Sequence, residues 1–505
     1  MKKLLALLLS VAMLAALAPL AIAEEAIDTS EHVNLRMLML GTKQADHELV
    51  WSEISKLAER DLNASITTDV LDMADQETKY SLILASGEPY DIIFTANWAH
   101  YDTEAPKGAF IEINEEVIKK YLPETYAQQP MEYLDHNRIG DGKVYLVPQN
   151  FVNLAGTAIT IREDLREKYN VPDVTDLASL EVYLDAIKAN EPGMFPYAIT
   201  QENQYLKNVA FNDLYEVVNL NGNPISYFFV FPWKAGMTTE EAAAAVQYIG
   251  DMPEYKEFAT LANRWAEKGF WSRSAIADAT AIRDSYENGQ SALFIQNTGT
   301  MGVANNALRG KDMKPKMIDI MPDAPRFMGL SQAGMAVPAN SKNQERALMF
   351  IDKLKFDIDY YGLYRWGIEN THWLDAGDRM WTSEGIEEGQ ARYVYGQGSW
   401  GFSNVHFEKD RVGADPESLV IWRRWRAENE QTNPLVNFTF NVEPVANEIA
   451  ALTNVRAQHL YLIDLGLAGD VDAAIDAMNA AAEAAGLAKI KEEMQKQLEA
   501  FLAAQ

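Results

Sequence analysis

The sequence predicts an α/β protein of two lobes with a helical C-terminal tail. Its 505 residues are too many for one compact core, because a domain usually holds about 100–200 residues. The first part of the chain alternates short apolar runs with helical patterns, an order typical of parallel strands joined by helical crossovers. The last part, residues 442–503, is rich in alanine with carboxylates and lysines on its polar face, which indicates helices packed on one lobe.

The first lobe is predicted to begin with a strand at residues 33–40. Helical patterns at 48–62 and near 77–85 follow, and the short apolar run 90–95 is the next strand. In open α/β sheets, ligands bind beyond the carboxyl ends of the strands. Residues 96–101, with two aromatic side chains flanked by Asn and His, are therefore a candidate part of a binding site, although packing under a loop would explain the aromatics equally well.

The rest of the chain predicts further elements with less regular spacing. Residues 191–288 are rich in aromatics and mixed in pattern, and no elements are predicted there. The other predicted elements are a turn at 140–143, strands at 144–148 and 158–161, a helix at 177–189, a strand at 291–295 with a polar turn at 296–300, a strand at 333–338 and a helix at 344–356.

The N-terminus has the features of a cleavable signal peptide. Lys2 and Lys3 precede an apolar run at 4–17, and Ala21-Ile22-Ala23 has the small-x-small form that a signal peptidase accepts. The alternative is an anchor that stays attached, but the run is shorter than the roughly 20 residues of a spanning helix. We therefore predict a signal peptide at residues 1–23 and an exported protein, extracellular, on the cell surface or periplasmic.

Composition excludes several classes of function. A formal net charge of −29 repels phosphate backbones and anionic lipid headgroups, so neither nucleic acid nor a membrane surface is expected as a partner. The absence of cysteine excludes disulfides, thiolate metal sites, cysteine nucleophiles and a lipid anchor on an N-terminal cysteine. With seven histidines and no close pair among them, we predict no metal site and no cofactor.

Four passages together carry a resemblance to a known family. They are Gly87-Glu88-Pro89-Tyr90-Asp91-Ile92, Asp141-Gly142-Lys143-Val144-Tyr145-Leu146-Val147-Pro148, Asn288-Gly289-Gln290-Ser291-Ala292-Leu293-Phe294 and Ala333-Gly334-Met335-Ala336-Val337-Pro338. In this order they resemble the extracellular solute-binding proteins of carbohydrate ABC importers, which include maltose-binding protein. The resemblance implies a periplasmic-binding-protein-like fold, in which each lobe is a mainly parallel sheet with flanking helices and the lobes are joined by hinge crossings. It also implies a monomer without catalytic residues that binds a sugar, expected to be an oligosaccharide, and delivers it to a membrane permease.

A narrower resemblance concerns the tail. Residues 438–501, with 364–373, are similar to a subset of these proteins that carries a C-terminal domain of unknown function. Members of that subset are usually lipoproteins, and the lack of cysteine departs from that pattern. The expected division is a first lobe of residues 24–148 and about 330–400, a second lobe of 149–329 and about 401–440, and a helical region, 441–505, packed on the second lobe.

Candidate ligand-binding residues are aromatic side chains for stacking on sugar rings and polar side chains for bonding hydroxyls. They are Asn97, Trp98, Tyr101, Gln149, Asn150, Asn297, Trp366, Glu369, Asn370 and His372, with Trp233 and Trp400 as weaker candidates. Each has a plainer interpretation. Trp366 could pack in a core, Gln149 and Asn150 could satisfy backbone groups at the hinge, and Glu369 could pair with Arg365.

Three alternatives remain open from the sequence. The ligand could be a peptide or an anionic sugar, which would need a cationic clamp such as Arg162, Arg365 or Lys234. A secreted glycoside hydrolase would need two carboxylates about 5–9.5 Å apart. An adhesin or sensor could use the same fold.

Overall fold

The computed structural model describes residues 27–129, 131–139, 141–150, 152–200, 205–220, 224–277, 282–309, 311, 313–322, 324, 326–330, 333–386, 392–393, 401–413, 421, 430–431, 433–436 and 438–503. The predicted signal peptide lies outside these residues. Within the described part, no helix combines the length and the apolar character needed to cross a bilayer.

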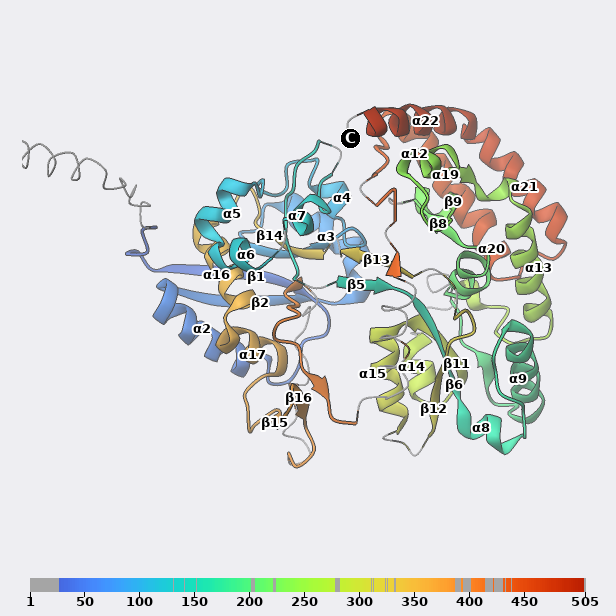
Figure 1. The fold of residues 1–505 in the computed structure, drawn as a ribbon, viewed down its shortest axis with the longest axis horizontal. Coiled ribbons are helices and arrows are strands. Elements are labelled where there is room, and N and C mark those ends of the chain that lie inside the picture. Colours follow the sequence, from blue (N-terminus) through green and yellow to red (C-terminus); the bar gives the residue numbers. More distant parts are fainter. Residues whose placement is uncertain are drawn as a thin grey trace, which may run out of the picture.

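The first lobe is built on a five-stranded sheet in the order β2-β1-β3-β14-β4. Strands β1 (Val33–Leu40), β2 (Ala64–Leu71) and β3 (Ile92–Ala96) are parallel, whereas β14 (Ala333–Ala336) and β4 (Val147–Pro148) form antiparallel pairs with their neighbours. The chain enters at the outer side of this lobe, so the carboxyl ends of the parallel strands point toward the second lobe (Figure 1).

Helices cover the sheet of the first lobe because each one places apolar residues on a single face. In α2 (His47–Leu62), Val50, Ile54 and Ala58 recur every four residues and are buried. The helix ends at Asn63, whose positive φ of 46° is the left-handed conformation common after a helix. The other helices are α3 (Met73–Ser86), α4 (Tyr101–Glu104), α5 (Glu115–Tyr121), α6 (Pro123–Gln128), α7 (Glu132–Asp135), α16 (Gln344–Phe356) and α17 (Ile358–Trp366).

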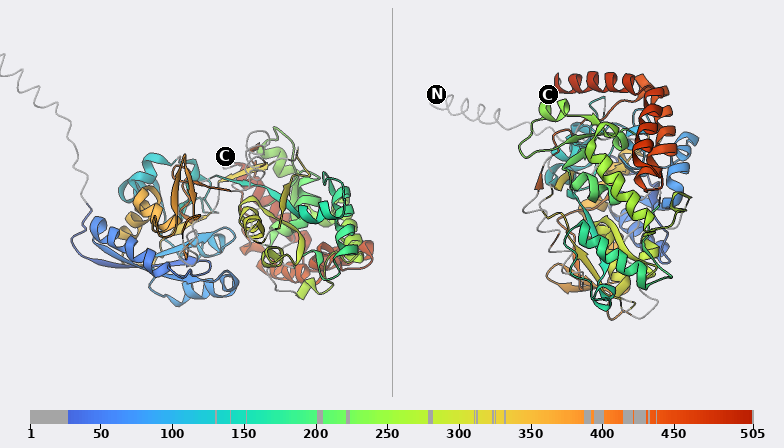
Figure 2. Two further views of the ribbon diagram at one scale, coloured as in Figure 1. Left: turned by 90° about the horizontal axis from the view of Figure 1, so that it is seen from below. Right: turned by 90° about the vertical axis from the view of Figure 1, so that its right-hand side faces the viewer.

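Three short strands connect the lobes and form one sheet, in the order β18-β13-β5. The chain leaves the first lobe through β5 (Val152–Ala155) and returns through β13 (Arg326–Leu330), which are antiparallel. It leaves again through β18 (Glu430–Gln431), which is parallel to β13. Figure 2 shows the two lobes side by side with these strands between them.

The second lobe is centred on a four-stranded sheet in the order β12-β6-β11-β7. Its central strand β6 (Thr157–Arg162) is antiparallel to β11 (Ser291–Asn297) and to β12 (Pro315–Ile318), and only β11 and β7 (Phe195–Tyr197) are parallel. The expectation of a mainly parallel sheet is therefore wrong for this lobe. The reason is that β6 continues directly from the crossing strand β5 and so runs opposite to β11.

Further strands and helices enclose the core of the second lobe. A smaller antiparallel sheet is formed by β8 (Val217–Asn219), β9 (Phe229–Pro232) and β10 (Gln247–Tyr248). The helices are α8 (Glu163–Lys168), α9 (Leu177–Asn190), α10 (Tyr205–Lys207) with the π-helical turn η1 (Asn208–Asp213), α11 (Ile225–Phe228), α12 (Thr239–Ala244), α13 (Pro253–Glu267), α14 (Ile282–Glu287) and α15 (Thr298–Arg309).

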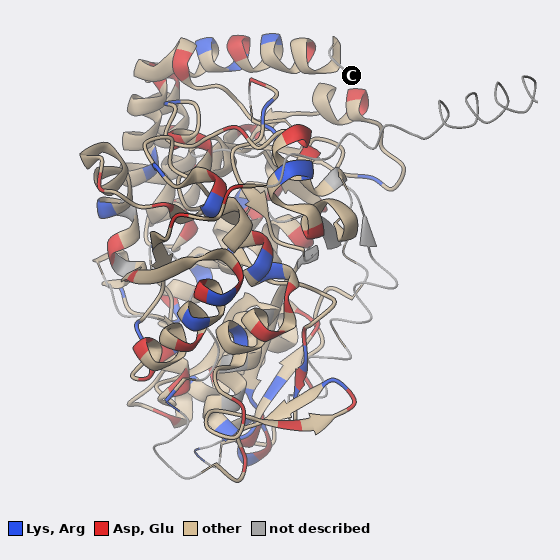
Figure 3. Cartoon of the chain, turned by 90° about the vertical axis from the view of Figure 1, so that its left-hand side faces the viewer, with Lys and Arg blue, Asp and Glu red and all other residues tan. Residues whose placement is uncertain are grey.

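The tail is helical and continues the core of the second lobe. Its helices are α19 (Ala446–Val455), the π-helical turn η6 (Arg456–Leu460), α20 (Tyr461–Asp464), α21 (Val471–Ala484) and α22 (Leu487–Ala503). They curve around the second lobe (Figures 1 and 2), and buried tail residues such as Leu452 and Met478 belong to the same apolar cluster as Phe258. Lysine and glutamate residues are interspersed along α22, which is coloured in blue and red bands in Figure 3.

One segment differs from the expected division of the chain. Residues 401–412, which we expected in the second lobe, pack with the first. Phe402 is part of the first-lobe core, and Val412 N donates to Trp381 O at 2.8 Å. Trp381 lies in a small sheet of β15 (Leu374–Gly377), β16 (Met380–Thr382) and β17 (Asp410–Arg411), and this pairing holds the segment on the first lobe.

Gly334 lies in β14, which packs closely between β3 and β4. A Cβ atom at this position would lie 2.1 Å from the carbonyl oxygen of Val147, which is backbone and cannot turn aside. We expect Gly334→Ala to lower the free energy of unfolding by about 2–3 kcal/mol, as overpacking does. Urea denaturation measures the change. Gly302→Ala in α15, where no atom lies within 4 Å, is the control and should be neutral or slightly stabilising. Equal midpoints for the two variants would contradict the prediction.

His47 makes the stability of the first lobe depend on pH. Its ring is fully buried, with Nε2 2.6 Å from the hydroxyl of Thr68, and burial lowers its pKa to about 4. Between that value and the ordinary value of 6.5, the unfolded chain binds the proton more readily, so stability falls as the pH drops through this window. We expect His47→Gln to reduce the loss of unfolding free energy between pH 7 and pH 5 by about 1–2 kcal/mol. Denaturation of both proteins at several pH values measures it, and identical pH profiles would refute it.

Candidate ligand-binding site

Trp98 is the exposed aromatic residue at the carboxyl end of β3. Its side chain is 48% exposed although its ring contacts Phe94, with 5.6 Å between ring centroids. Asn97, also exposed, accepts a hydrogen bond from Trp98 N through its own Oδ1 at 2.9 Å, which shapes the turn. The turn leads into α4, on the side of the first lobe that faces the second (Figure 1). These two predicted residues are therefore an exposed aromatic ring and an exposed polar group at this end of the first lobe.

Tyr101, a predicted site residue, is not part of the candidate site, whereas its neighbour Asp102 is a new candidate. Tyr101 is fully buried, and its hydroxyl donates to Asn137 O at 2.8 Å and accepts from Tyr145 N at 3.0 Å, so it holds the core rather than a ligand. Asp102 is the next residue, and its Oδ1 is buried without a partner among the described residues. Burial raises the pKa of Asp102 to about 6. Sequence reasoning missed Asp102, although a carboxylate four residues after an exposed Trp was a usable signal.

Gln149 and Asn150 lie where the chain leaves the first lobe. Gln149 N donates to Ala333 O at 3.1 Å, and Asn150 N donates to Ser403 O at 2.9 Å. The side chain of Asn150 donates to Asn404 Oδ1 at 2.9 Å, so this side chain fastens the crossing through another side chain and not through backbone groups. Gln149 Nε2 is buried and has no partner among the described residues, which leaves it as a donor for a ligand.

A buried lysine lies beneath this start of the crossing. Lys355 is 1% exposed, and its Nζ donates to Pro148 O at 2.6 Å and to Gln129 Oε1. Gln129 in turn donates through Nε2 to Gln149 O at 2.9 Å. Burial lowers the pKa of Lys355, and Asp352, one helical turn earlier, opposes that shift. The chain is therefore tied to the first lobe up to Asn150, and bending between the lobes must occur beyond it.

Polar side chains also gather at the crossing end of the second lobe. Asn297 is exposed at the end of β11 and pairs in register with Thr157, the first residue of β6. Its Oδ1 accepts from Thr300 N at 2.9 Å, so it also begins α15. Asn208 donates through Nδ2 to Thr157 Oγ1 at 3.3 Å. Sequence reasoning found Asn297 but missed Asn208, which lies in a π-helical turn of the stretch left without predicted elements; such turns are frequent at functional sites.

The aromatic residues after α17 form a core cluster instead of a binding surface. Trp366 is 2% exposed and packs with Tyr361, Trp373 and Trp381. His372 is buried too, and its Nδ1 accepts from Ile368 N at 2.9 Å. The prediction that Trp366 and His372 bind ligand is wrong, because both rings are buried against other parts of the first lobe.

The remaining candidates are dispersed. Glu369 and Asn370 are exposed in the turn between these aromatics, where Asn370 has a positive φ of 63°. Trp233 is buried in the core of the second lobe, so it offers no stacking face. Trp400 lies outside the described residues.

Two of the three cationic side chains considered for an anionic ligand already form ion pairs with carboxylates of the protein. Arg162 Nη2 lies 2.6 Å from Asp164, and Arg365 Nη2 lies 2.8 Å from Glu408. Lys234 is exposed in the loop after β9. Among the residues that the structure describes, no three His, Asp or Glu side chains are arranged to hold a metal ion.

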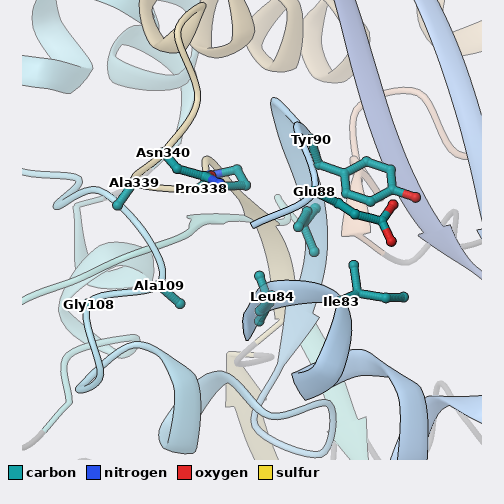
Figure 4. A pocket seen from close by; sticks show the side chains of 10 residues that line it. Ile83, Leu84, Glu88, Tyr90, Gly108, Ala109, Pro338, Ala339 and Asn340 are labelled. Carbon is teal, nitrogen blue, oxygen red and sulfur yellow. The ribbon is translucent and has the colours of Figure 1, made fainter. Parts of the chain in front are cut away.

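Two cavities of the first lobe lie away from the crossing. One of about 160 Å³ is lined by Leu84, Tyr90, Ala109, Pro338 and neighbouring residues at the amino-terminal end of β3 (Figure 4). It is smaller than the ~300–1,000 Å³ of typical ligand pockets, and it lies at the opposite end of the strand from Trp98. The other, of about 330 Å³, lies between α2 and the edge strand β2.

Comparison with known proteins agrees with this architecture. Residues 434–503 match a family described as a domain of unknown function, DUF3502. The chain is 25% identical over 495 residues to a carbohydrate ABC transporter substrate-binding protein of Streptococcus pneumoniae serotype 4, covering 95% of this chain and 93% of the relative. The predicted resemblance, including the subset with the C-terminal domain, is confirmed.

Solved structures extend the agreement to the fold. An N-glycan transport solute-binding protein from S. pneumoniae superposes with a TM-score of 0.73 at 21% identity, covering 94% of this chain and 99% of that chain. A solute-binding protein from Bifidobacterium longum infantis is described as binding HMO and as associated with an ABC transporter. It superposes with a TM-score of 0.65 at 14% identity, covering 93% of this chain and 99% of that chain. The chain has the fold of the solute-binding proteins. The predicted fold class is confirmed.

Asp102 should make the solute-binding fold less stable at neutral pH. Because burial raises its pKa, the folded protein binds the proton more readily than the unfolded chain, and stability falls as the pH rises from about 4 to above 6. We expect Asp102→Asn, which imitates the neutral acid, to raise the free energy of unfolding at pH 7 by about 1–2 kcal/mol and to leave it nearly unchanged at pH 3.5. Urea denaturation at both pH values measures this. A variant that is less stable than the wild type at pH 7 would contradict it.

Proposed function

We propose that this protein is the extracytoplasmic solute-binding component of an ABC importer and that it captures an oligosaccharide between its two lobes. The observation that carries the proposal is the exposed Trp98 at the carboxyl ends of the first-lobe strands, with Asn208 and Asn297 at the crossing end of the second lobe. An aromatic face opposite polar amides suits a sugar, which has apolar ring faces and hydroxyl edges. The named carbohydrate-binding relatives support the same class of ligand.

Binding would proceed by closure about the three crossing strands. The described contacts tie residues 148–150 to the first lobe, so the lobes would move as bodies about β5, β13 and β18. A ligand that touches both lobes selects the closed form, because it binds that form more tightly. Export, release to a permease and a monomeric state belong to this proposal. The chain would bind and hand over its ligand without breaking bonds.

A neutral ligand is favoured over an anionic one. Arg162 and Arg365 are neutralised by carboxylates, and an anion would have to displace those partners to use them. Asp102 adds a buried carboxyl group near Trp98, which accepts hydrogen bonds from hydroxyls and repels negative charge. We therefore place neutral oligosaccharides ahead of uronides and acidic peptides.

Truncation of Trp98 tests the proposed function. We expect calorimetry to detect binding of at least one neutral oligosaccharide in a panel of mannose-containing, human-milk and fructose oligosaccharides. Trp98→Ala should weaken that binding at least about tenfold, as loss of a central aromatic contact does. Asp102→Asn should also weaken it, although the same change stabilises the fold.

The matched control is Phe195→Ala. Phe195 is 47% exposed but lies at the start of β7, at the far end of the second-lobe sheet from Asn297. Its loss should leave the affinity unchanged. Binding of peptides with no response to any sugar would refute the carbohydrate assignment, and equal effects of the Trp98 and Phe195 changes would refute the site.

A further inference from the structure

The C-terminal domain, residues 434–503, meets the second lobe through a buried charge. Asp464, the last residue of α20, has a side chain only 1% exposed. Its Oδ1 accepts a hydrogen bond from the hydroxyl of Tyr255 at 2.7 Å, and its Oδ2 lies 3.2 Å from Nζ of Lys207, whose side chain is 12% exposed. A buried carboxylate is tolerated only when such partners replace the water that it loses. Both partners here belong to the second lobe.

Lys207 directly precedes Asn208, a residue of the candidate ligand site. It ends α10, whose first residue, Tyr205, is partly buried and packs against the second-lobe core. Asn208 follows Lys207 directly and donates to Thr157 at the start of β6. Lys207 thus lies one residue from a side chain that reaches the crossing end of the second lobe. A shift of Lys207 would move Tyr205 and Asn208 together.

The domain itself is fixed rigidly around Asp464. Leu465 O accepts from Trp271 Nε1 at 3.0 Å, and a Cβ at Gly466 would lie 2.1 Å from Ala262 O, so backbone meets backbone there. Eight residues before Asp464, the guanidinium of Arg456 stacks on the ring of Tyr227 at 3.4 Å. Asp464 therefore presents its carboxylate from a fixed position.

We propose that the C-terminal domain positions the second-lobe wall of the ligand site, with Asp464 as a positioning residue that acts through Lys207 on Tyr205 and Asn208. This inference rests on the proposed function, because it gives the domain a role in the same site. It assigns Asp464 no contact with the ligand. The domain would supply a fixed counter-charge that holds α10 and η1 in the arrangement that binds.

Asp464→Asn is the direct test, because it keeps the size of the side chain and an acceptor for Tyr255 but removes the charge facing Lys207. Hydrogen exchange of residues 205–213 in the ligand-free protein should accelerate by about tenfold, since the segment opens more often. Affinity for the oligosaccharide found by calorimetry should fall by about tenfold. In a double-mutant cycle, Asp464→Asn should be non-additive with Asn208→Ala and additive with Trp98→Ala, which lies on the other lobe.

Glu448→Gln is the matched control, because Glu448 pairs at 2.7 Å with Lys489, which also belongs to the C-terminal domain. It should change neither exchange at 205–213 nor affinity. If Asp464→Asn does not fold, Lys207→Met removes the other partner and should give the same two effects. Unchanged exchange at 205–213 in a folded variant overturns the inference, as does faster exchange with unchanged affinity or an additive cycle with Asn208→Ala. A wild-type protein that binds no carbohydrate would refute the proposed function instead, while exchange would still report whether Asp464 holds α10.

Discussion

The two-lobed arrangement depends on how the first crossing is held where it leaves the first lobe. Residues 148–150 find partners for their backbone groups within that lobe, through Lys355, Gln129 and the segment that contains Asn404. Burying the ammonium of Lys355 is costly unless its N–H groups donate hydrogen bonds. Pro148 O and Gln129 Oε1 accept such bonds. Because these contacts hold this end, we expect the proposed closure of the lobes to bend the chain at the three crossing strands.

Much of the fold could be predicted from the sequence wherever strands are buried on both faces. Residues 33–40, 90–95 and 291–295 are apolar runs, and each forms a central strand. The missed strand β2, Ala64–Leu71, lies at an edge, where half-exposed Thr and Asp side chains interrupt the apolar pattern. The second-lobe elements between 191 and 288 are short and irregular, and long-range packing rather than local periodicity decides their form.

The candidate site was harder to predict because the same residue type serves both core and surface. Trp98 follows β3 and Trp366 is the last residue of α17, so both lie where a regular element ends. Trp366 is buried because Trp373 and Trp381 fold back onto it, whereas Trp98 stays 48% exposed although its ring contacts Phe94. Such packing is not encoded in spacing along the chain. Asp102 and Asn208 were missed for the same reason, since their significance comes from what lies beside them.

The two walls of the proposed site are supported in different ways. The first-lobe wall follows directly from a buried parallel sheet, which fixes the turn after β3 by its own hydrogen bonds. The second-lobe wall includes a short helix and a π-helical turn, which have few hydrogen bonds of their own to resist distortion. A counter-charge from a separately packed domain can supply that resistance. The C-terminal domain shares the apolar core of the second lobe, so we expect it to stay with that lobe during the proposed closure and to keep its contact with Lys207.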